Sequence, residues 1–368
     1  MIPLSSPDIT DAEIAAVTSV LRSGRLSLGP ELVAFERALA RTHNTADAVA
    51  VSSGTTALHL ALVALGIGPG DEVILPSFTF VAVANVVAQV GATPVFAEIE
   101  AATLNLDPIA AEQAITPRTR ALIVVHTFGI PAQMDAFVEL TQRHGILLIE
   151  DACEAIGARF DNRPVGSFGS LAALGFYPNK QITTGEGGAL LVNDPALATR
   201  LRLLRNQGRD AAAGWLDHAE LGFNYRLSDI ACALGRVQLQ RLEEILALRA
   251  RAAANYNDLL GKLDELELPP LQVAHRALSW FVYAVRLPLH IDRDRLVAQL
   301  AEHGIAAGRY FPPIHHQPAW RTHPCAQLSL PITESISARA LALPFFTRIT
   351  REQQEAVVDT LSCLLSSH

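Results

Sequence analysis

Short apolar runs alternate with longer helical patterns over the first two-thirds of the chain. Five runs have the length and composition of strands, at residues 48–53, 71–77, 94–99, 121–128 and 146–152. The helical patterns between them are found at residues 56–67, 79–91 and 134–145. The strand runs are continuously apolar, as expected where helices bury both faces of a sheet. This alternation predicts an α/β fold with a mostly parallel sheet.

The last third of the chain has a different pattern. A long helical stretch from about Leu227 to Leu263 is expected to link two domains. After it come a strand-like run, a helix, a Pro- and His-rich loop and a last helix, at residues 279–288, 292–304, 310–320 and from about Thr350. A chain of 368 residues suits more than one core. We therefore expect a large domain over residues 1–240 and a small α+β domain over residues 241–368.

Composition narrows the classes of partner. Half of the chain is apolar and 18% is charged, the opposite of a disordered protein. The net charge of −8, with no basic block, argues against a nucleic-acid surface. The polar, acidic start is not typical of a signal peptide, and the apolar runs are too short to span a bilayer. The four scattered cysteines form neither a disulfide framework nor a zinc pattern. We expect a cytoplasmic protein without a membrane or nucleic-acid partner.

One bias in composition points to a single residue. The 29 basic residues include only two lysines, Lys180 and Lys262. Arginine stays protonated, whereas a lysine amine can lose its proton and attack a carbonyl. Lys262 lies in LLGKLDELE, typical of a solvated helix or turn. Lys180 lies in FYPNKQITTGEGG, where a glycine-rich turn lets the backbone approach a ligand. A surface lysine beside a hairpin is the alternative, but the lack of lysine elsewhere favours Lys180 as a reactive residue.

Two further segments have both a functional and an ordinary interpretation. Ser52-Ser53-Gly54-Thr55-Thr56, between a strand and a helix, is suited to bind a phosphate but also to cap a helix. Glu150 and Asp151 end a strand run, where a carboxylate faces the crevice that binds ligands in open α/β sheets. They are equally suited to cap a helix after that strand. A pyridoxal-phosphate (PLP) enzyme needs one such carboxylate, to keep the pyridine nitrogen protonated.

In this order, the segments resemble the DegT/StrS family of PLP-dependent sugar aminotransferases. The resemblance extends over SSGTTALHLAL, GDEVILPSFTFVAVANVV, IEDACEAIGA, FYPNKQITTGEGG, LGFNYRLSDI and YFPPIHHQPAW. The lysine-plus-GEGG and EDA blocks are specific to the family. The resemblance implies the aspartate-aminotransferase fold of the type I PLP-dependent transferases. It also implies a homodimer whose active sites lie at the subunit interface.

The resemblance also implies roles for individual residues. Lys180 would hold PLP as a Schiff base and then move protons, and Asp151 would pair with the pyridine nitrogen. Gly54 and Thr55 would hold the phosphate, and Phe80 would stack on the ring. The neighbouring subunit's copy of Asn224 would reach the same phosphate. On the substrate side, the resemblance implies Tyr310 and His315, while Arg226 would be structural or would hold a substrate phosphate.

Two positions depart from the family pattern. Many members carry a serine where this chain has Gly175, so the backbone of Gly175 would contact the cofactor and phosphate binding would rest more on the other groups. Glu154 replaces the usual Gln or His over the ring and resembles members that make 4-amino sugars of the perosamine type.

The roles of three histidines are either undecided or have an ordinary structural interpretation. His126 would either approach the ring or be a satisfied core histidine. His315 and His316 have no third ligand at a usual spacing in the sequence, so no metal site is expected.

The function implied is transfer of an amino group to a nucleotide-linked keto-deoxy sugar, with L-glutamate as donor. A first alternative is a PLP- or pyridoxamine-phosphate-dependent sugar dehydratase. Members of that type replace the lysine with histidine, so Lys180 argues against it. A second alternative is a non-catalytic regulatory member of the same fold. It predicts a lost lysine or aspartate, yet both Lys180 and Asp151 are present.

Overall fold

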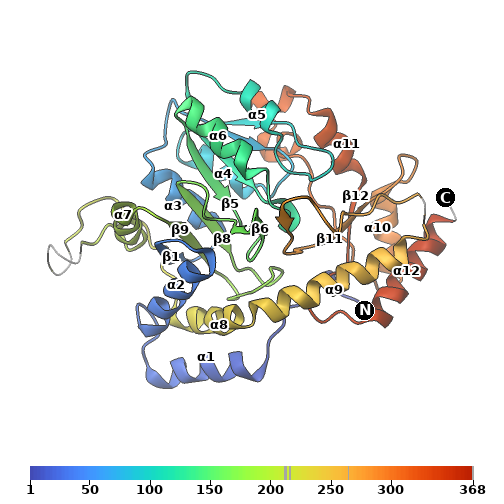
Figure 1. Cartoon of the computed structure of the whole chain (residues 1–368), viewed down its shortest axis with the longest axis horizontal. Coiled ribbons are helices and arrows are strands. Elements are labelled where there is room, and N and C mark those ends of the chain that lie inside the picture. The colour runs from blue at the N-terminus through green and yellow to red at the C-terminus, as the bar shows by residue number, and fades with distance from the viewer. Residues whose placement is uncertain (211–213, 215–216, 264, 367–368) are drawn as a thin grey trace.

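The five predicted strands join two further strands, at residues 171–175 and 188–192, in one large sheet. The structure is a computed structural model that describes residues 1–210, 214, 217–263 and 265–366. Within these residues the largest sheet has seven strands, in the spatial order β1-β9-β8-β5-β4-β2-β3. Figure 1 shows helices packed around this sheet. The strands are β1 (Asp47–Val51), β2 (Glu72–Pro76), β3 (Thr93–Ala97), β4 (Thr119–Val125), β5 (Leu147–Asp151), β8 (Leu171–Gly175) and β9 (Gly188–Val192).

The direction of the strands confirms a mostly parallel α/β sheet. The pairs β2–β3, β2–β4, β4–β5 and β5–β8 are parallel. Only β9 among the seven runs the other way, antiparallel to both β8 and β1. The carboxyl ends of the other six strands therefore meet at one edge, which β9 joins by its amino end. The β8–β9 hairpin encloses the segment that carries Lys180.

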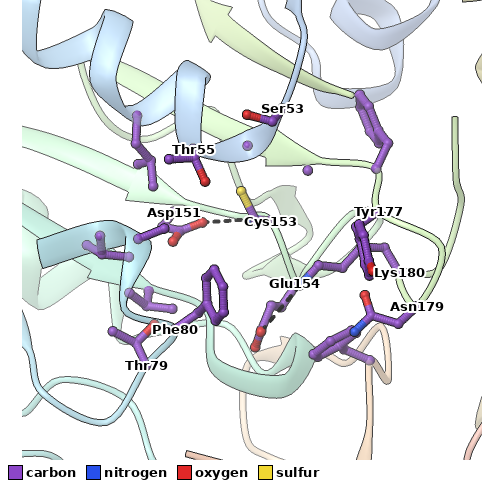
Figure 2. Close-up of a pocket in the computed structure, with 18 of the residues that line it drawn as sticks. Ser53, Thr55, Thr79, Phe80, Asp151, Cys153, Glu154, Tyr177, Asn179 and Lys180 are labelled. Carbon is purple, nitrogen blue, oxygen red and sulfur yellow. Dashed lines mark hydrogen bonds and ion pairs between the residues drawn. The ribbon is translucent and has the colours of Figure 1, made fainter. Parts of the chain in front are cut away.

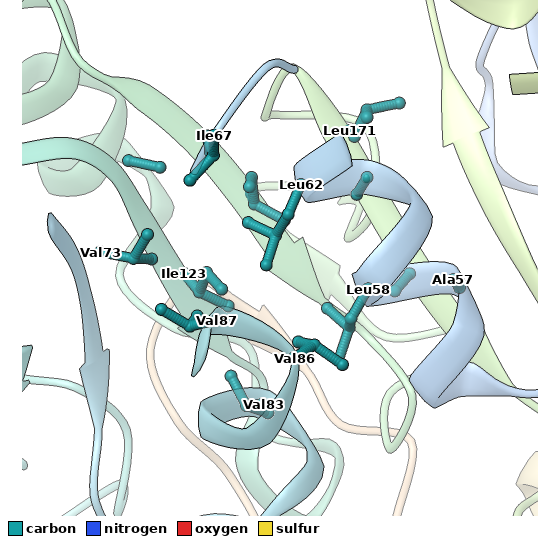
Figure 3. Packing of buried hydrophobic residues seen from close by; sticks show 14 of the residues in the cluster. Ala57, Leu58, Leu62, Ile67, Val73, Val83, Val86, Val87, Ile123 and Leu171 are labelled. Carbon is teal, nitrogen blue, oxygen red and sulfur yellow. The ribbon is translucent and has the colours of Figure 1, made fainter. Parts of the chain in front are cut away.

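Both faces of the sheet are buried, which explains the continuously apolar strand runs. Val73 and Ile123 pack on one face against Leu62 and other residues of the nearby helices, as Figure 3 shows. Ile74 and Leu122, their neighbours along the same strands, belong to a different core on the opposite face. Truncating a fully buried leucine such as Leu62 to alanine typically costs about 2–5 kcal/mol. The two cores hold the strands, and hence the strand ends, in fixed positions.

Helices cover the sheet and extend beyond it. The first two, α1 and α2, are absent from the sequence-based expectation, although Thr10 and Glu13 form a capping box at the start of α1. The helices are α1 (Asp11–Ser23), α2 (Pro30–His43), α3 (Gly54–Ala64), α4 (Ala82–Gln89), α5 (Pro108–Gln113), α6 (Met134–His144), α7 (Pro195–Arg205), α8 (Asp229–Gln240), α9 (Leu242–Leu260), α10 (Arg293–Glu302), α11 (Pro331–Arg339) and α12 (Arg351–Leu365). Short 3₁₀ turns are η1 (Thr127–Gly129), η2 (Ile314–His316), η3 (Pro318–Trp320) and η4 (Pro324–Gln327).

The long helical stretch consists of two helices rather than one. The regular helix is interrupted at Arg241, whose φ and ψ are −95° and 6°. The guanidinium of Arg241 binds the carboxylates of Asp8 and Glu13, which ties this point to the N-terminal segment. Figure 1 shows α8 under the sheet and α9 continuing towards the C-terminal helices. The stretch is therefore helical, as predicted, but with a break at Arg241.

A second packed region surrounds the C-terminal strands. β11 (Tyr283–Arg286) pairs antiparallel with β12 (Ala340–Leu343), a strand that the sequence pattern did not predict. A separate apolar core joins residues of α9, α10 and α12 to this pair. A small sheet contains β10 (Arg276–Ala277), β6 (Arg159–Phe160) and β7 (Arg163–Pro164). The division into domains at residue 240 stays a prediction.

No helix in the described part of the chain combines the length and the apolar character needed to cross a membrane.

Candidate functional site

A pocket of about 400 Å³ opens at the edge of the sheet where the parallel strands end. Residues that follow β1, β2 and β8 line it, together with the end of β5 and the residues before β9. Phe281, Tyr310 and Phe311 of the C-terminal region line it as well. Figure 2 shows its main side chains pointing toward a common space. This edge is the usual ligand site of open α/β sheets.

The segment after β1 both caps a helix and lines the pocket. Ser53 and Thr56 form the capping box of α3, so their hydroxyls are engaged in local hydrogen bonds. Gly54 and Thr55, the first two residues of α3, line the pocket. The first backbone N–H groups of a helix have no partner within it and favour an anion. The capping interpretation is confirmed for Ser53 and Thr56, and phosphate binding by Gly54 and Thr55 stays a prediction.

Close backbone contacts explain two glycines at this end of the pocket. A Cβ on Gly188 would lie 2.4 Å from the carbonyl carbon and oxygen of Ser53, so only glycine lets β9 pass the start of α3. A Cβ on Gly54 would lie 2.8 Å from the sulfur of Cys153. Larger residues at either position would push the start of α3 away from the pocket.

Cys153 occupies the space beside Gly175. A Cβ on Gly175 would lie 3.2 Å from both the Cβ and the Sγ of Cys153. Burial, with the nearby Asp151 carboxylate, holds the pKa of the Cys153 thiol well above its usual range. A neutral thiol therefore fills the space next to Gly175.

The last two residues of β5 point to opposite faces of the sheet. Asp151 lines the pocket, and its Oδ1 accepts a hydrogen bond of 3.0 Å from the backbone N–H of Cys153 (Figure 2). Glu150 points away, and its carboxylate accepts backbone N–H groups of Gly166, Phe168 and Gly169 at 2.6–2.8 Å. Because successive strand residues alternate in direction, only Asp151 is in position to meet a ligand.

His126 is a satisfied core histidine. It is fully buried, and its Nδ1 accepts a hydrogen bond of 3.0 Å from the backbone N–H of Ala132. The proton is therefore on Nε2, which donates to Oε2 of Glu150 at 3.1 Å. Burial alone would raise the pKa of Glu150, but the hydrogen bonds from His126 and from the backbone outweigh it and lower that pKa. His126 is not among the residues that line the pocket.

Lys180 reaches the pocket beside a buried carboxylate. Its Nζ lies 3.4 Å from Oε1 of Glu154 and 3.9 Å from the centre of the Phe281 ring. The other oxygen of Glu154 accepts a hydrogen bond from the backbone N–H of Phe128. Burial raises the pKa of Glu154 even though Lys180 and Phe128 oppose the rise. Glu154 is thus a carboxyl group that is easily protonated next to the only lysine of the pocket.

Aromatic side chains shape the open side of the pocket. Phe80 follows β2 and is 59% exposed, with its ring over the pocket in Figure 2. Tyr310 also lines the pocket, and burial and the Glu154 charge raise its pKa, against a hydrogen bond with Asn179. Exposed aromatic rings at a pocket are suited to cover a flat ligand.

Three expected site residues lie outside this pocket in the single chain. Asn224 is exposed, in the segment between α7 and α8. Arg226 is held by the side-chain oxygens of Asn206 and Gln207, at 2.9 and 3.2 Å. His315 is buried against Ser77, with 2.7 Å between Nδ1 and Oγ.

Other lining residues were not identified from the sequence: Cys153, Tyr177, Asn179, Glu186 and Phe281. Four of them lie within or next to the blocks around Asp151 and Lys180, so their position in those blocks was the available signal. Phe281 lies in the strand-like run 279–288, and no pattern marked it as facing a pocket.

Comparisons with known proteins agree with one another. The sequence pattern of the DegT/DnrJ/EryC1/StrS aminotransferase family matches residues 7–362. A GDP-perosamine synthase of Caulobacter vibrioides is 41% identical over 345 residues, covering 92% of this chain and 91% of that protein. A dTDP-3-amino-3,4,6-trideoxy-α-D-glucose transaminase of Streptomyces venezuelae is 42% identical over 349 residues, covering 94% and 90%. The crystal structure of S. venezuelae DesV with a ketimine intermediate superposes with a TM-score of 0.91 at 40% identity, covering 99% of this chain and 98% of DesV.

Proposed function

Because the chain belongs to the DegT/DnrJ/EryC1/StrS aminotransferase family, whose members depend on PLP, we propose that it aminates a nucleotide-linked keto-deoxy sugar. The observation that carries the proposal is that the amine of Lys180 and the carboxylate of Asp151 face one pocket. The start of α3 closes that pocket at one end.

The residues of the pocket fit PLP, which has a phosphate, a ring nitrogen and an aldehyde. The start of α3, at Gly54 and Thr55, is suited to the phosphate, because helix N-termini favour anions. Asp151 is suited to keep the ring nitrogen protonated, and Phe80 to cover the ring. Lys180 supplies the amine that an aldehyde requires. Bound PLP supplies an electron sink for reactions at the carbon that carries nitrogen.

The remaining chemistry falls to side chains of this chain. Nζ of Lys180 would hold the cofactor and would move the substrate proton in both half-reactions. Oε1 of Glu154, at 3.4 Å from Nζ, holds or returns a proton as the charge of Lys180 changes. The burial that raises the pKa of Glu154 suits it to that role.

The substrate proposal is supported by the names of the relatives. One makes GDP-perosamine and the other is a transaminase of a dTDP-linked amino sugar. We propose a nucleotide-linked keto sugar for this chain too, with Tyr310 on the substrate side of the pocket and L-glutamate as the donor. We place the reaction in the cytoplasm.

We further propose a homodimer with shared active sites. Asn224 is exposed and does not line the pocket of its own chain, so a role at the phosphate requires the partner's pocket. Arg226, two residues later, would face the same neighbouring site, and His315 would act from behind Ser77 rather than by direct contact.

Visible absorbance tests the reaction. We expect purified protein to be yellow, to lose its yellow band on addition of L-glutamate, and to be colourless as Lys180→Ala. A protein that stays colourless with added PLP would refute the proposal. A yellow band that L-glutamate leaves unchanged would overturn the donor, and loss of a sugar hydroxyl without amination would favour the dehydratase. Full colour without turnover of any keto sugar would favour a regulatory member.

Subunit complementation tests the shared site. Lys180→Ala and Asn224→Ala chains are each expected to be nearly inactive. After unfolding and refolding together, mixed dimers would contain one site with both residues intact, and activity would return. An inactive mixture, or an Asn224→Ala chain with full activity, would contradict the shared site.

A further inference from the structure

Two histidines and a carboxylate gather outside the proposed active site. His315 and His316 lie in η2, and Glu334 lies in the first turn of α11. One ligand atom of each lies within 4.8 Å of the others. In the described residues this is the one group of three His, Cys, Asp or Glu side chains so arranged. The sequence did not reveal it, because Glu334 comes from a later helix.

From this cluster we propose that His315, His316 and Glu334 bind one divalent cation of the zinc class. Imidazole nitrogen and carboxylate oxygen are ordinary ligands of Zn²⁺, Co²⁺ and Ni²⁺. Nothing in the proposed aminotransferase reaction uses the three residues together, so the proposal stands apart from that function.

The distance between two of the ligands suits such an ion. Nε2 of His315 lies 3.3 Å from Oε1 of Glu334. Ligands about 2.0–2.1 Å from a tetrahedral zinc ion are separated by about 3.4 Å. His315 and Glu334 are also close enough at this distance for a simple hydrogen bond. The position of His316 therefore distinguishes a metal site from a hydrogen bond alone. The His316 ring lies 4.2 Å from the His315 ring, centre to centre, and is exposed, which leaves it free to turn toward the ion.

Hydrogen bonds to neighbouring groups orient the side chains of His315 and Glu334. Nδ1 of His315 lies 2.7 Å from Oγ of Ser77 in a buried contact, which orients the ring with Nε2 toward Glu334. Oε1 of Glu334 accepts the backbone N–H of Leu330 at 2.8 Å, at the start of α11. Metal-binding histidines usually have such a partner on the second ring nitrogen. With Glu334 about one-third exposed, one side of the site is open to an ion and water.

The test is a titration of the tag-free holoenzyme with CoCl₂, read by the visible d–d bands of Co²⁺, and with ZnCl₂ by calorimetry. We expect about one ion per chain. His316→Ala and Glu334→Gln should each weaken binding at least about tenfold, and Ser77→Ala should weaken it by about tenfold or more. Glutamine at 334 keeps an acceptor for the Leu330 N–H. His290→Ala, which removes an exposed histidine elsewhere, should leave the affinity unchanged.

Absence of binding would overturn the proposal, as would binding that neither His316→Ala nor Glu334→Gln weakens. The second result would mean an adventitious ion only. Because metal binding is measured without turnover, neither result depends on the aminotransferase proposal.

Discussion

Two adjacent carboxylates at the end of β5 have opposite surroundings. Glu150 has four donors from the protein, three backbone N–H groups and His126. Asp151 accepts one backbone N–H and otherwise faces the pocket with the thiol of Cys153 nearby. The protein thus satisfies the carboxylate of Glu150 itself, whereas the carboxylate of Asp151 is open to the pocket. Residue type and position in the strand are nearly the same, so the number of donors is what distinguishes the two acids.

The largest expected effect comes from changing Asp151, the carboxylate that faces the pocket. Asp151→Asn should lower kcat/KM about 10³-fold, because a neutral amide cannot stabilise a protonated ring nitrogen in a site of low polarity. Its unfolding midpoint should change little, since Asp151 has one backbone partner. Kinetics and urea unfolding measure the two quantities. A variant that is active but unstable would reverse the roles of the two acids.

Glu150→Gln should have the complementary effect. It places an amide against N–H donors in a fully buried site and should cost about 3 kcal/mol of unfolding free energy. The lowered pKa of Glu150 stabilises the fold above its ordinary value of 4.5, and this contribution is lost as the pH falls through the lowered pKa. The variant should therefore lose less stability on acidification. Glu139→Gln, at a largely exposed position, is the matched control, with a change within about 0.5 kcal/mol.

His126→Ala should also lower the unfolding free energy, but by less than Glu150→Gln. It removes two hydrogen bonds but leaves Glu150 its three backbone donors, so we expect a loss of about 2 kcal/mol. The kcat of the folded fraction should stay unchanged, because the ring does not line the pocket. A fall in kcat with normal stability would instead show that His126 acts on the cofactor.

Glu154→Gln should have the smallest effect on the unfolding free energy, and this effect should depend most on pH. The raised pKa of Glu154 means that the folded protein binds its proton more tightly than the unfolded chain does. The wild type should therefore lose stability relative to the variant as the pH rises above 4.5 toward the raised pKa. Urea unfolding at a series of pH values measures the difference. Parallel curves would show that Glu154 ionises normally.

Local patterns in the sequence predict the sheet and the main groups of the site. The apolar runs identify β2 and β4 because helices bury both of their faces, and the same pattern locates Asp151 at a strand end. The scarcity of lysine singles out Lys180. The strands and their ends are predictable because they depend on residues that are neighbours in the sequence.

Features made by distant residues were not predicted. Nothing next to Glu150 in the sequence shows that residues 166–169 supply its donors, so the residues alone did not separate its role from that of Asp151, and only the family resemblance favoured Asp151. β12 has four residues and is defined by its pairing with β11. The packing of Cys153 against Gly175 and the approach of Glu334 to His315 are likewise contacts across the fold.

The reversed strand β9 has a consequence for how the protein folds. β8 and β9 pair across the loop of residues 176–187, so the backbone around Lys180 is able to form from contacts near in sequence, which close quickly. β1, which leads into the start of α3, joins the sheet only by pairing with β9, with Asp47 opposite Val192. β1 and β9 are far apart in the sequence, and pairing of segments so far apart is slow. We therefore expect the pocket to be completed by the arrival of β1, so that uptake of the cofactor reports a late step in folding.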